Sequence, residues 1–234
     1  MSAPERPEVK ICGLTRREDA AAAAALGADY LGAVLSRGFR RSVPPEAAGT
    51  LLVGLRPVRV AVLVDESVER AVDLAGTLDA GVIQLHGSEP PEVAAELGAE
   101  RRWRIWKSVR ARSGDDVRRC AERYGSSVEA ILVEGFREGV VGGGGVRLPE
   151  GEFGSLRDLV PATLRIVLAG GLTPETVGAA VDHFEPHVVD VSSGVELEPG
   201  RKSPELVGWF IRAAGGGASP ADAPGHPVRR GGTT

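Results

Sequence analysis

The sequence has few cysteines, no long apolar run and no strong excess of either charge. Two cysteines in 234 residues, Cys12 and Cys120, do not make a disulfide framework. No stretch approaches the roughly 18 apolar residues of a membrane-spanning helix, and residues 1–7 lack the apolar core of a secretion signal. The 28 Lys and Arg residues are scattered among 32 acidic ones, so no basic field suits nucleic acid. These absences predict a cytoplasmic protein with reduced thiols that binds neither membrane nor nucleic acid.

The length and composition bound the number of domains. A chain of 234 residues with 42% hydrophobic content can bury one substantial core. Residues 215–234 consist of Gly, Pro, Ala and a few charged residues, and they cannot bury enough apolar area to become ordered. We therefore expect one catalytic domain over residues 1–214 and a disordered tail over 215–234.

Short runs rich in Val, Ile and Leu alternate with longer segments rich in Ala and charged residues. Such continuously apolar runs are typical of parallel strands buried on both faces, and the longer segments can form crossover helices. The pattern predicts helices that include 16–26, 66–78 and 115–124, with helix caps at Thr15, Thr173 and Ser203. The predicted strands are 9–14, 30–36, 58–64, 80–86, 104–110, 130–135, 165–170 and 187–193.

Eight βα units can form a closed (β/α)8 barrel or an open doubly wound sheet. The open folds usually carry a Gly-rich nucleotide motif directly after the first strand. Here that position reads Ile11-Cys12-Gly13-Leu14-Thr15, which favours an α/β fold of the TIM-barrel class. In such barrels the chemistry takes place at the C-terminal ends of the strands.

The predicted strand ends are polar where a core would be apolar. They combine an acid, a thiol and an arginine with small-residue loops, which suits acid–base chemistry on an anionic substrate. A long Gly-containing segment, 136–151, follows the sixth strand, and we interpret it as a mobile active-site loop. The polar strand-end residues are Lys10, Cys12, Arg41, Gln84, His86, Lys107, Glu134 and Asp190.

The loops after the seventh and eighth strands predict a phosphate site. Gly170 and Gly171 follow the seventh strand, and Ser193 and Gly194 follow the eighth. Glycines let backbone amides approach phosphate oxygens, and a short helix that begins near Gly194 would add its positive end. The alternative is that these glycines form ordinary strand-to-helix turns.

Cys12 has two interpretations, because free cysteines often act as small buried hydrophobes. Its position favours chemistry: it follows Lys10 by two residues on the same face of the strand, at the mouth of the predicted barrel. A nearby cation favours the thiolate, which is the form that acts as a base. Cys120 lies in an amphipathic helix, and we expect it to be structural.

Four motifs together resemble the phosphoribosylanthranilate isomerase family of tryptophan biosynthesis. The resemblance runs from about Val9 to Ala213 and includes the following Pro199-Gly200-x-Lys202. Each motif alone would be weak, whereas the combination is specific. The motifs are Lys10-Ile11-Cys12-Gly13-Leu14-Thr15, Val82-Ile83-Gln84-Leu85-His86-Gly87, Leu168-Ala169-Gly170-Gly171-Leu172-Thr173-Pro174 and Asp190-Val191-Ser192-Ser193-Gly194-Val195-Glu196.

The resemblance implies an Amadori rearrangement of a small phosphoribosyl substrate. A general acid protonates the ribose ring oxygen, the ring opens to a Schiff base, and a general base removes the C2' proton. The base is then Cys12 and the acid is Glu134. Arg41 matches an arginine that contacts the anthranilate carboxylate, with Arg40 as the alternative. Asp190 matches an aspartate near the substrate amine.

The resemblance adds further expectations. Lys10, Gln84 and His86 are placed among the substrate-binding residues, and the loops after strands seven and eight match the phosphate site. No metal and no organic cofactor is implied. We expect a monomer or a homodimer.

The sequence departs from the family pattern at several places. Glu134 stands where the family usually has an aspartate, and the extra methylene requires a compensating pocket, because a shift of about 1 Å in a catalytic group can cost on the order of 100-fold in rate. Gly38-Phe39 stands where Ser-Pro is more frequent before the arginine, and Ser203 stands where an aspartate is common. Two alternatives therefore stay open: a paralogue acting on another phosphoribosyl amine, and a non-catalytic barrel that binds phosphosugars.

Overall fold

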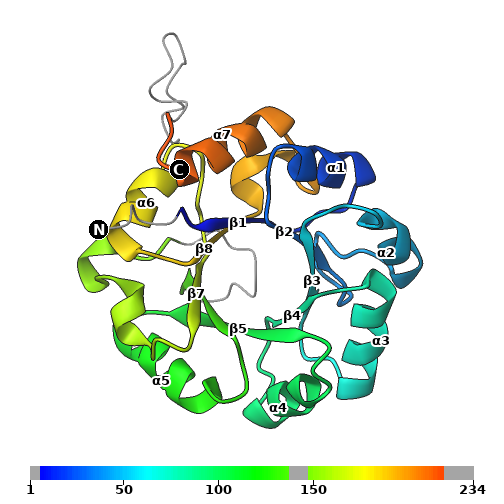
Figure 1. Ribbon diagram of the computed structural model, residues 1–234, viewed down its shortest axis with the longest axis horizontal. Helices are drawn as coiled ribbons and strands as arrows, with labels where there is room; N and C mark the ends of the chain where they lie inside the picture. Colours follow the sequence, from blue (N-terminus) through cyan, green and yellow to red (C-terminus); the bar gives the residue numbers. More distant parts are fainter. Residues whose placement is uncertain (1–5, 137–146, 219–234) are drawn as a thin grey trace.

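The computed structural model describes residues 6–136 and 147–218, and its strands form one closed barrel. The strands follow one another around the barrel in chain order, and β1 closes the ring by pairing in parallel with β8. Seen along the barrel axis in Figure 1, the strands form an inner ring and the helices surround it. The predicted (β/α)8 barrel is confirmed.

Each predicted strand is present, and several end earlier than expected. The first strand, for example, ends at Ile11 and not at residue 14, because the chain turns into the loop that carries Cys12. The strands are β1 Glu8–Ile11, β2 Tyr30–Val34, β3 Val58–Leu63, β4 Val82–Leu85, β5 Arg104–Ala111, β6 Ala130–Gly135, β7 Arg165–Leu168 and β8 Val188–Val191.

Helices connect most of the strands. No helix in the described part of the chain is long and apolar enough to cross a membrane. Between β6 and β7 the described residues form only the short 3-10 turns η1 (Glu150–Glu152) and η2 (Leu156–Leu159). The α-helices are α1 Arg17–Ala25, α2 Pro45–Leu51, α3 Val68–Leu78, α4 Pro91–Ala99, α5 Gly114–Tyr124, α6 Val177–Phe184 and α7 Pro204–Ala214.

One of the three predicted helix caps is correct. Ser203 caps α7 and accepts a hydrogen bond from the Leu206 N–H at 3.3 Å. The Thr15 hydroxyl instead donates to the Gly200 carbonyl at 2.7 Å, so α1 begins without a side-chain cap. At Thr173 the chain first makes a turn, because its own N–H donates to the Thr176 hydroxyl oxygen, and α6 begins only at Val177.

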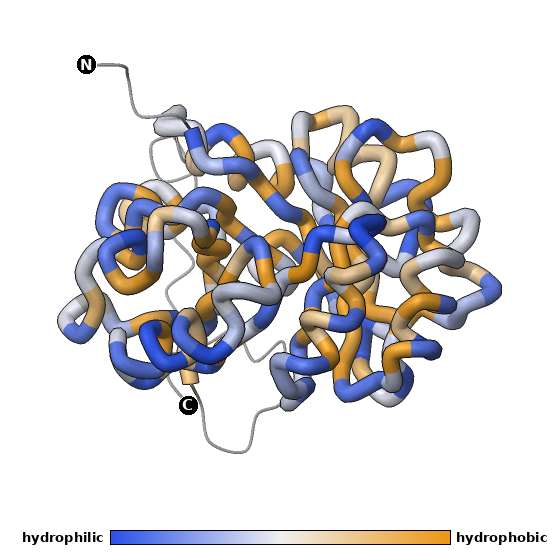
Figure 2. Tube along the Cα trace, turned by 60° about the horizontal axis from the view of Figure 1, so that its bottom comes forward, coloured by the Kyte–Doolittle hydropathy of each residue, from blue (hydrophilic) through white to orange (hydrophobic). Residues whose placement is uncertain are grey.

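The strands separate two hydrophobic regions. Residues on one strand face fill the barrel interior, where Tyr30 and Trp106 make an edge-to-face contact with ring centroids 5.0 Å apart. Residues on the other face pack against the helices. In Figure 2, hydrophobic stretches run through the middle of the molecule, and hydrophilic and hydrophobic residues alternate along the outer segments. Side chains alternate along a strand, so the register decides which polar residues reach the cavity.

Beyond the eighth strand a small hairpin precedes the last helix. Its strands are β9 (Glu196–Glu198) and β10 (Arg201–Lys202), paired antiparallel. Sequence patterning did not predict this hairpin. Residues 219–234, which make up most of the predicted tail, lie outside the described residues, so the tail stays a prediction.

Candidate active site

A cavity of about 660 Å³ opens at the C-terminal ends of the strands. Of the predicted strand-end and loop residues, all but Lys10 and Lys107 line it, and Lys10 lies buried next to it with no exposed surface. Strands far apart in the sequence therefore bring these side chains together. The predicted residues along the cavity wall are Cys12, Arg41, Gln84, His86, Glu134, Gly170, Gly171, Asp190, Ser193 and Gly194.

Cys12 lies directly after β1, above a buried ion pair. Lys10 and Asp190 are register partners on β1 and β8, and the Lys10 Nζ lies 3.0 Å from the Asp190 Oδ2. The thiol fits because Gly32 on β2 has no side chain: a Cβ there would lie 2.9 Å from the Cys12 Sγ and 3.2 Å from the Lys10 Cε. Gly32 was not predicted as a site residue, since its role depends on packing between strands.

The protonation of Cys12 differs from the thiolate that its neighbour Lys10 was expected to favour. Burial raises the pKa of the Cys12 thiol, and the opposing effect of the Lys10 ammonium does not outweigh it. For Lys10, burial lowers the pKa, but the Asp190 carboxylate and the Cys12 sulfur outweigh burial and raise it. Lys10 therefore stays an ammonium, as expected, whereas the resting form of Cys12 is the neutral thiol.

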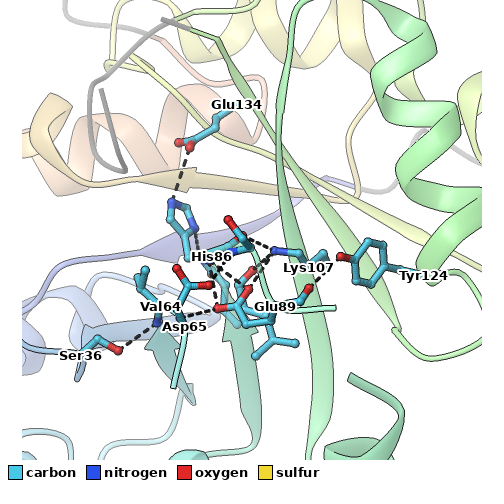
Figure 3. Close-up of polar contacts among 12 residues, drawn as sticks. Ser36, Val64, Asp65, His86, Glu89, Lys107, Tyr124 and Glu134 are labelled. Atoms are coloured by element: carbon cyan, nitrogen blue, oxygen red, sulfur yellow. Dashed lines mark hydrogen bonds and ion pairs between the residues drawn. The ribbon is translucent and has the colours of Figure 1, made fainter. Parts of the chain in front are cut away.

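Glu134 points into the cavity from the end of β6 and meets His86, which follows β4. The His86 Nε2 lies 3.5 Å from the Glu134 Oε1, as Figure 3 shows. The other ring nitrogen, Nδ1, lies 2.9 Å from the Gln84 Nε2. Each ring nitrogen of His86 thus faces a polar side chain, Gln84 on one side and Glu134 on the other. Glu134 is 8% exposed and is thus not an ordinary solvated carboxylate.

Arg41 is held at the cavity wall by Glu196, which sequence reasoning did not assign to the site. The Arg41 Nε and Nη2 lie 2.8 and 2.6 Å from the two Glu196 carboxylate oxygens. Lys202 in the hairpin also binds Glu196, at 2.8 Å, and donates to the Ser192 carbonyl at 3.0 Å. Burial tends to raise the pKa of Glu196, but hydrogen bonds from Arg41 and Lys202 outweigh it and lower that pKa.

Glu196 and Lys202 both stand within motifs that the sequence displays, at the end of DVSSGVE and in Pro199-Gly200-x-Lys202. Their charge, next to a predicted phosphate loop, could have indicated from the sequence that they belong to the site. What the sequence does not show is the hairpin that folds Lys202 back over Glu196.

The predicted phosphate loops lie side by side. Gly170 and Gly171 both have positive φ, 92° and 62°, a conformation that favours glycine. At Gly194 a Cβ would lie only 1.9 Å from the Leu172 carbonyl oxygen, so the loop after β8 touches the loop after β7 through bare backbone. The predicted short helix near Gly194 is a 3-10 turn, η3 (Ser193–Val195), which gives fewer aligned amides than an α-helix.

Lys107, which was also expected at a strand end of the site, faces the outer helices and not the cavity. Its Nζ pairs with Glu89 at 3.0 Å and lies 5.8 Å from the centre of the Tyr124 ring on α5. Most of the predicted mobile loop, residues 137–146, lies outside the described residues. No group of His, Cys, Asp and Glu side chains in the described ranges is arranged to hold a metal ion.

Comparison with known proteins agrees with this geometry. Residues 9–213 match the family model described as N-(5'-phosphoribosyl)anthranilate isomerase. The chain belongs to the phosphoribosylanthranilate isomerase family. It is therefore an isomerase of tryptophan biosynthesis, as the motifs predicted.

Individual relatives of this family cover most of the chain. The phosphoribosylanthranilate isomerase of Syntrophus aciditrophicus is 37% identical over 209 residues, covering 88% of this chain and 86% of its own. The crystal structure of the Thermotoga maritima enzyme is 35% identical with a TM-score of 0.79, covering 90% of this chain and 99% of its own. Another solved member, in complex with reduced 1-(o-carboxyphenylamino)-1-deoxyribulose 5-phosphate, has a TM-score of 0.75 at 35% identity, with coverage of 90% and 99%.

Proposed function

We propose that this chain converts N-(5'-phosphoribosyl)anthranilate to 1-(2-carboxyphenylamino)-1-deoxyribulose 5-phosphate, with Glu134 as the general acid and Cys12 as the general base. The observation that carries the assignment is that β6 and β1 bring these two groups to the wall of one cavity, together with the predicted phosphate loops and an arginine. Family membership supports the reaction, and the geometry supports the residues.

Glu134 protonates the ribose ring oxygen, the C1'–O bond breaks, and the nitrogen lone pair forms the protonated Schiff base. As Glu134 loses its proton, the resulting carboxylate lies 3.5 Å from the His86 Nε2. With its proton on Nε2, the imidazole faces the developing negative charge and stabilises it without reorganisation. His86 therefore supplies the pocket that a glutamate needs in place of the shorter family aspartate.

Cys12 first gives up its own thiol proton to solvent while the cavity is open, and the resulting thiolate then removes the C2' proton. The electron pair of the C2'–H bond forms the C1'=C2' double bond, and the electron pair of the C1'=N bond returns to the iminium nitrogen. The enol that results becomes the ketone by a proton shift. Because burial raises the thiol pKa, the thiolate is a strong base once formed. Lys10, buried next to the sulfur and paired with Asp190, compensates its charge.

Arg41 suits the anthranilate carboxylate. Its two hydrogen bonds to Glu196 use the Nε–Nη2 edge of the guanidinium. The Nη1–Nη2 edge offers a second pair of parallel donors, which matches a carboxylate. Arg41 also packs against the Cys12 loop, where a Cβ on Gly13 would lie 2.5 Å from its Cδ. Arg40 lines the same cavity but is exposed, which supports Arg41 as the contact.

The test is turnover of phosphoribosylanthranilate, followed by the loss of the substrate's fluorescence. We expect Cys12→Ser to lower kcat at least about tenfold, because general base catalysis contributes on the order of 100-fold or more. Cys120→Ser is the matched control and leaves kcat unchanged, since Cys120 packs in α5 among the outer helices. Absence of wild-type turnover, with binding of a reduced product analogue retained, would contradict the proposal and favour a non-catalytic barrel.

Oligomeric state and location stay predictions. One solved relative is described as monomers of a dimeric phosphoribosylanthranilate isomerase from Thermotoga maritima, at 36% identity and a TM-score of 0.76. We propose a monomer or a homodimer for this chain in the cytoplasm, and sedimentation equilibrium distinguishes the two assemblies.

A further inference from the structure

A buried ion pair lies outside the barrel, behind the loop that carries His86. Lys107 on β5 and Glu89, which precedes α4, are each 4% exposed, and the Lys107 Nζ lies 3.0 Å from the Glu89 Oε2 (Figure 3). The proposed mechanism uses neither residue. The Tyr124 hydroxyl on α5 also donates to the Glu89 carbonyl, at 2.7 Å, so the pair is anchored to the helical layer.

The pair binds the backbone on both sides of His86. Besides Glu89, the Lys107 ammonium donates to the carbonyls of Leu85 at 3.3 Å and Gly87 at 2.7 Å. The Glu89 carboxylate accepts the Gly87 N–H at 3.0 and 3.1 Å. One charged pair therefore fixes the residue before His86 through its carbonyl and the residue after it through both backbone groups.

The same carboxylate joins this loop to its neighbour. Glu89 accepts the Asp65 N–H at 3.0 Å, and the Asp65 Oδ1 accepts the Ser88 N–H at 2.6 Å. A side chain on Gly87 would collide with Asp65, since a Cβ there would lie 2.4 Å from its Oδ1. The loops after β3 and β4 thus form one hydrogen-bonded unit around the ion pair.

Stability alone does not account for burying these charges. Removing two charged groups from water costs several kcal/mol each, and replacing a buried pair by apolar residues is often neutral or stabilising. All three Lys107 donors have acceptors, and the acceptors are backbone groups around His86 in addition to Glu89. The charged pair holds the backbone on both sides of His86 in a fixed position.

We propose that the Lys107–Glu89 pair is a positioning device that holds His86 against the Glu134 carboxyl group. This inference rests on the proposed role of Glu134 as the acid. The His86 ring lies between Gln84, at 2.9 Å, and Glu134, at 3.5 Å. The position of the His86 backbone sets both of these distances. A small movement of that backbone changes the distance to Glu134 and leaves the cavity otherwise intact.

The test is a neutral double variant, Lys107→Met with Glu89→Gln, assayed with phosphoribosylanthranilate. Substituting both residues avoids an uncompensated buried charge, and the amide oxygen that Glu89→Gln introduces can still accept the Gly87 N–H. We expect kcat to fall about tenfold, which corresponds to about 1.4 kcal/mol, while KM changes less than about twofold. The matched control is Glu8→Gln with Arg165→Met, an ion pair between strands β1 and β7; it leaves kcat within about twofold of wild type.

A double-mutant cycle with His86→Ala separates positioning from a general structural effect. In the His86→Ala background the neutral double variant causes no further loss of kcat beyond about twofold if the pair acts through His86. An undiminished tenfold loss in that background, or wild-type kcat in the double variant alone, would overturn the proposal. Where the double variant does not fold, Lys107→Arg provides the same cycle, because it keeps the charge that pairs with Glu89 and changes the donor geometry toward the Leu85 and Gly87 carbonyls.

The proposed acid role of Glu134 and the proposed positioning role of the Lys107–Glu89 pair are tested by different results. Full turnover by Glu134→Gln would remove the acid assignment without touching the coupling between Lys107–Glu89 and His86. If the losses of kcat from His86→Ala and from the neutral double variant are additive while Glu134→Gln is inactive, the pair has no positioning role and Glu134 is still the acid. The two outcomes are thus distinguishable.

Discussion

The imidazole of His86 lies 3.5 Å from the carboxylate of Glu134, at the mouth of the barrel. This contact links β4 to β6, two strands that are not neighbours in the barrel. In the mechanism proposed above, this contact holds the Glu134 carboxyl group in position to act as the acid.

Removal of the imidazole tests this contact. We expect His86→Ala to lower kcat about tenfold, which corresponds to about 1.4 kcal/mol, because the Glu134 carboxyl group then loses its polar neighbour at 3.5 Å. Steady-state kinetics with phosphoribosylanthranilate measures the loss, and KM changes less than kcat. A raised KM with unchanged kcat would assign His86 to substrate binding alone.

A methyl group on Gly32 tests the packing around the thiol. In Gly32→Ala the new Cβ lies 2.9 Å from the Cys12 Sγ and 3.3 Å from the Cys12 Cα, so the thiol must move. We expect kcat to fall at least about tenfold with the fold retained, because a displacement of about 1 Å can cost on the order of 100-fold. Gly49→Ala on α2 is the control, since a Cβ there meets its nearest atom at 3.6 Å. Equal kcat for both variants would show that the site tolerates the shift.

The protonation of Cys12 can be measured by its reactivity. Alkylation proceeds through the thiolate, and burial raises the pKa of this thiol above its usual 9.0. In a Cys120→Ser background we therefore expect the rate of iodoacetamide labelling to increase with pH and to be still rising at pH 9.0. A plateau below that pH would mean that Lys10 lowers the pKa more than burial raises it.

Replacement of Arg41 tests recognition of the substrate carboxylate. Lys offers a point charge and not two parallel donors, so we expect Arg41→Lys to raise KM about tenfold, close to the loss of one charge-assisted hydrogen bond. The neighbouring, exposed Arg40→Lys is the control, and its KM stays within about twofold of wild type. The opposite pattern would assign the contact to Arg40.

The barrel could be predicted from the sequence because its strands are buried on both faces. Residues 60–63 and 130–133, for example, are apolar runs whatever their neighbours are. The cap at Thr15 was wrong because its hydroxyl donates to Gly200, which is 185 positions away. A local pattern cannot show such a competing partner.

Much of the site could be predicted for the same reason, since the ends of parallel strands converge on one face of a barrel. Cys12, His86 and Glu134 stand at such ends. The partners that hold them could not be predicted. Lys202 reaches Glu196, the partner of Arg41, because a hairpin folds back, and Lys107 faces outward by the alternation of its strand. These roles depend on register and on contacts between distant segments.

The turnover number of Glu134→Gln tests the central assignment most directly. Glutamine keeps the size and polarity of the side chain but cannot deliver the proton that opens the ribose ring. We predict that kcat falls about 100-fold with a small change in KM, within the range of general acid catalysis, and that Glu134→Asp is also slower than wild type because its carboxyl group lies farther from His86. Wild-type kcat in Glu134→Gln would contradict the account.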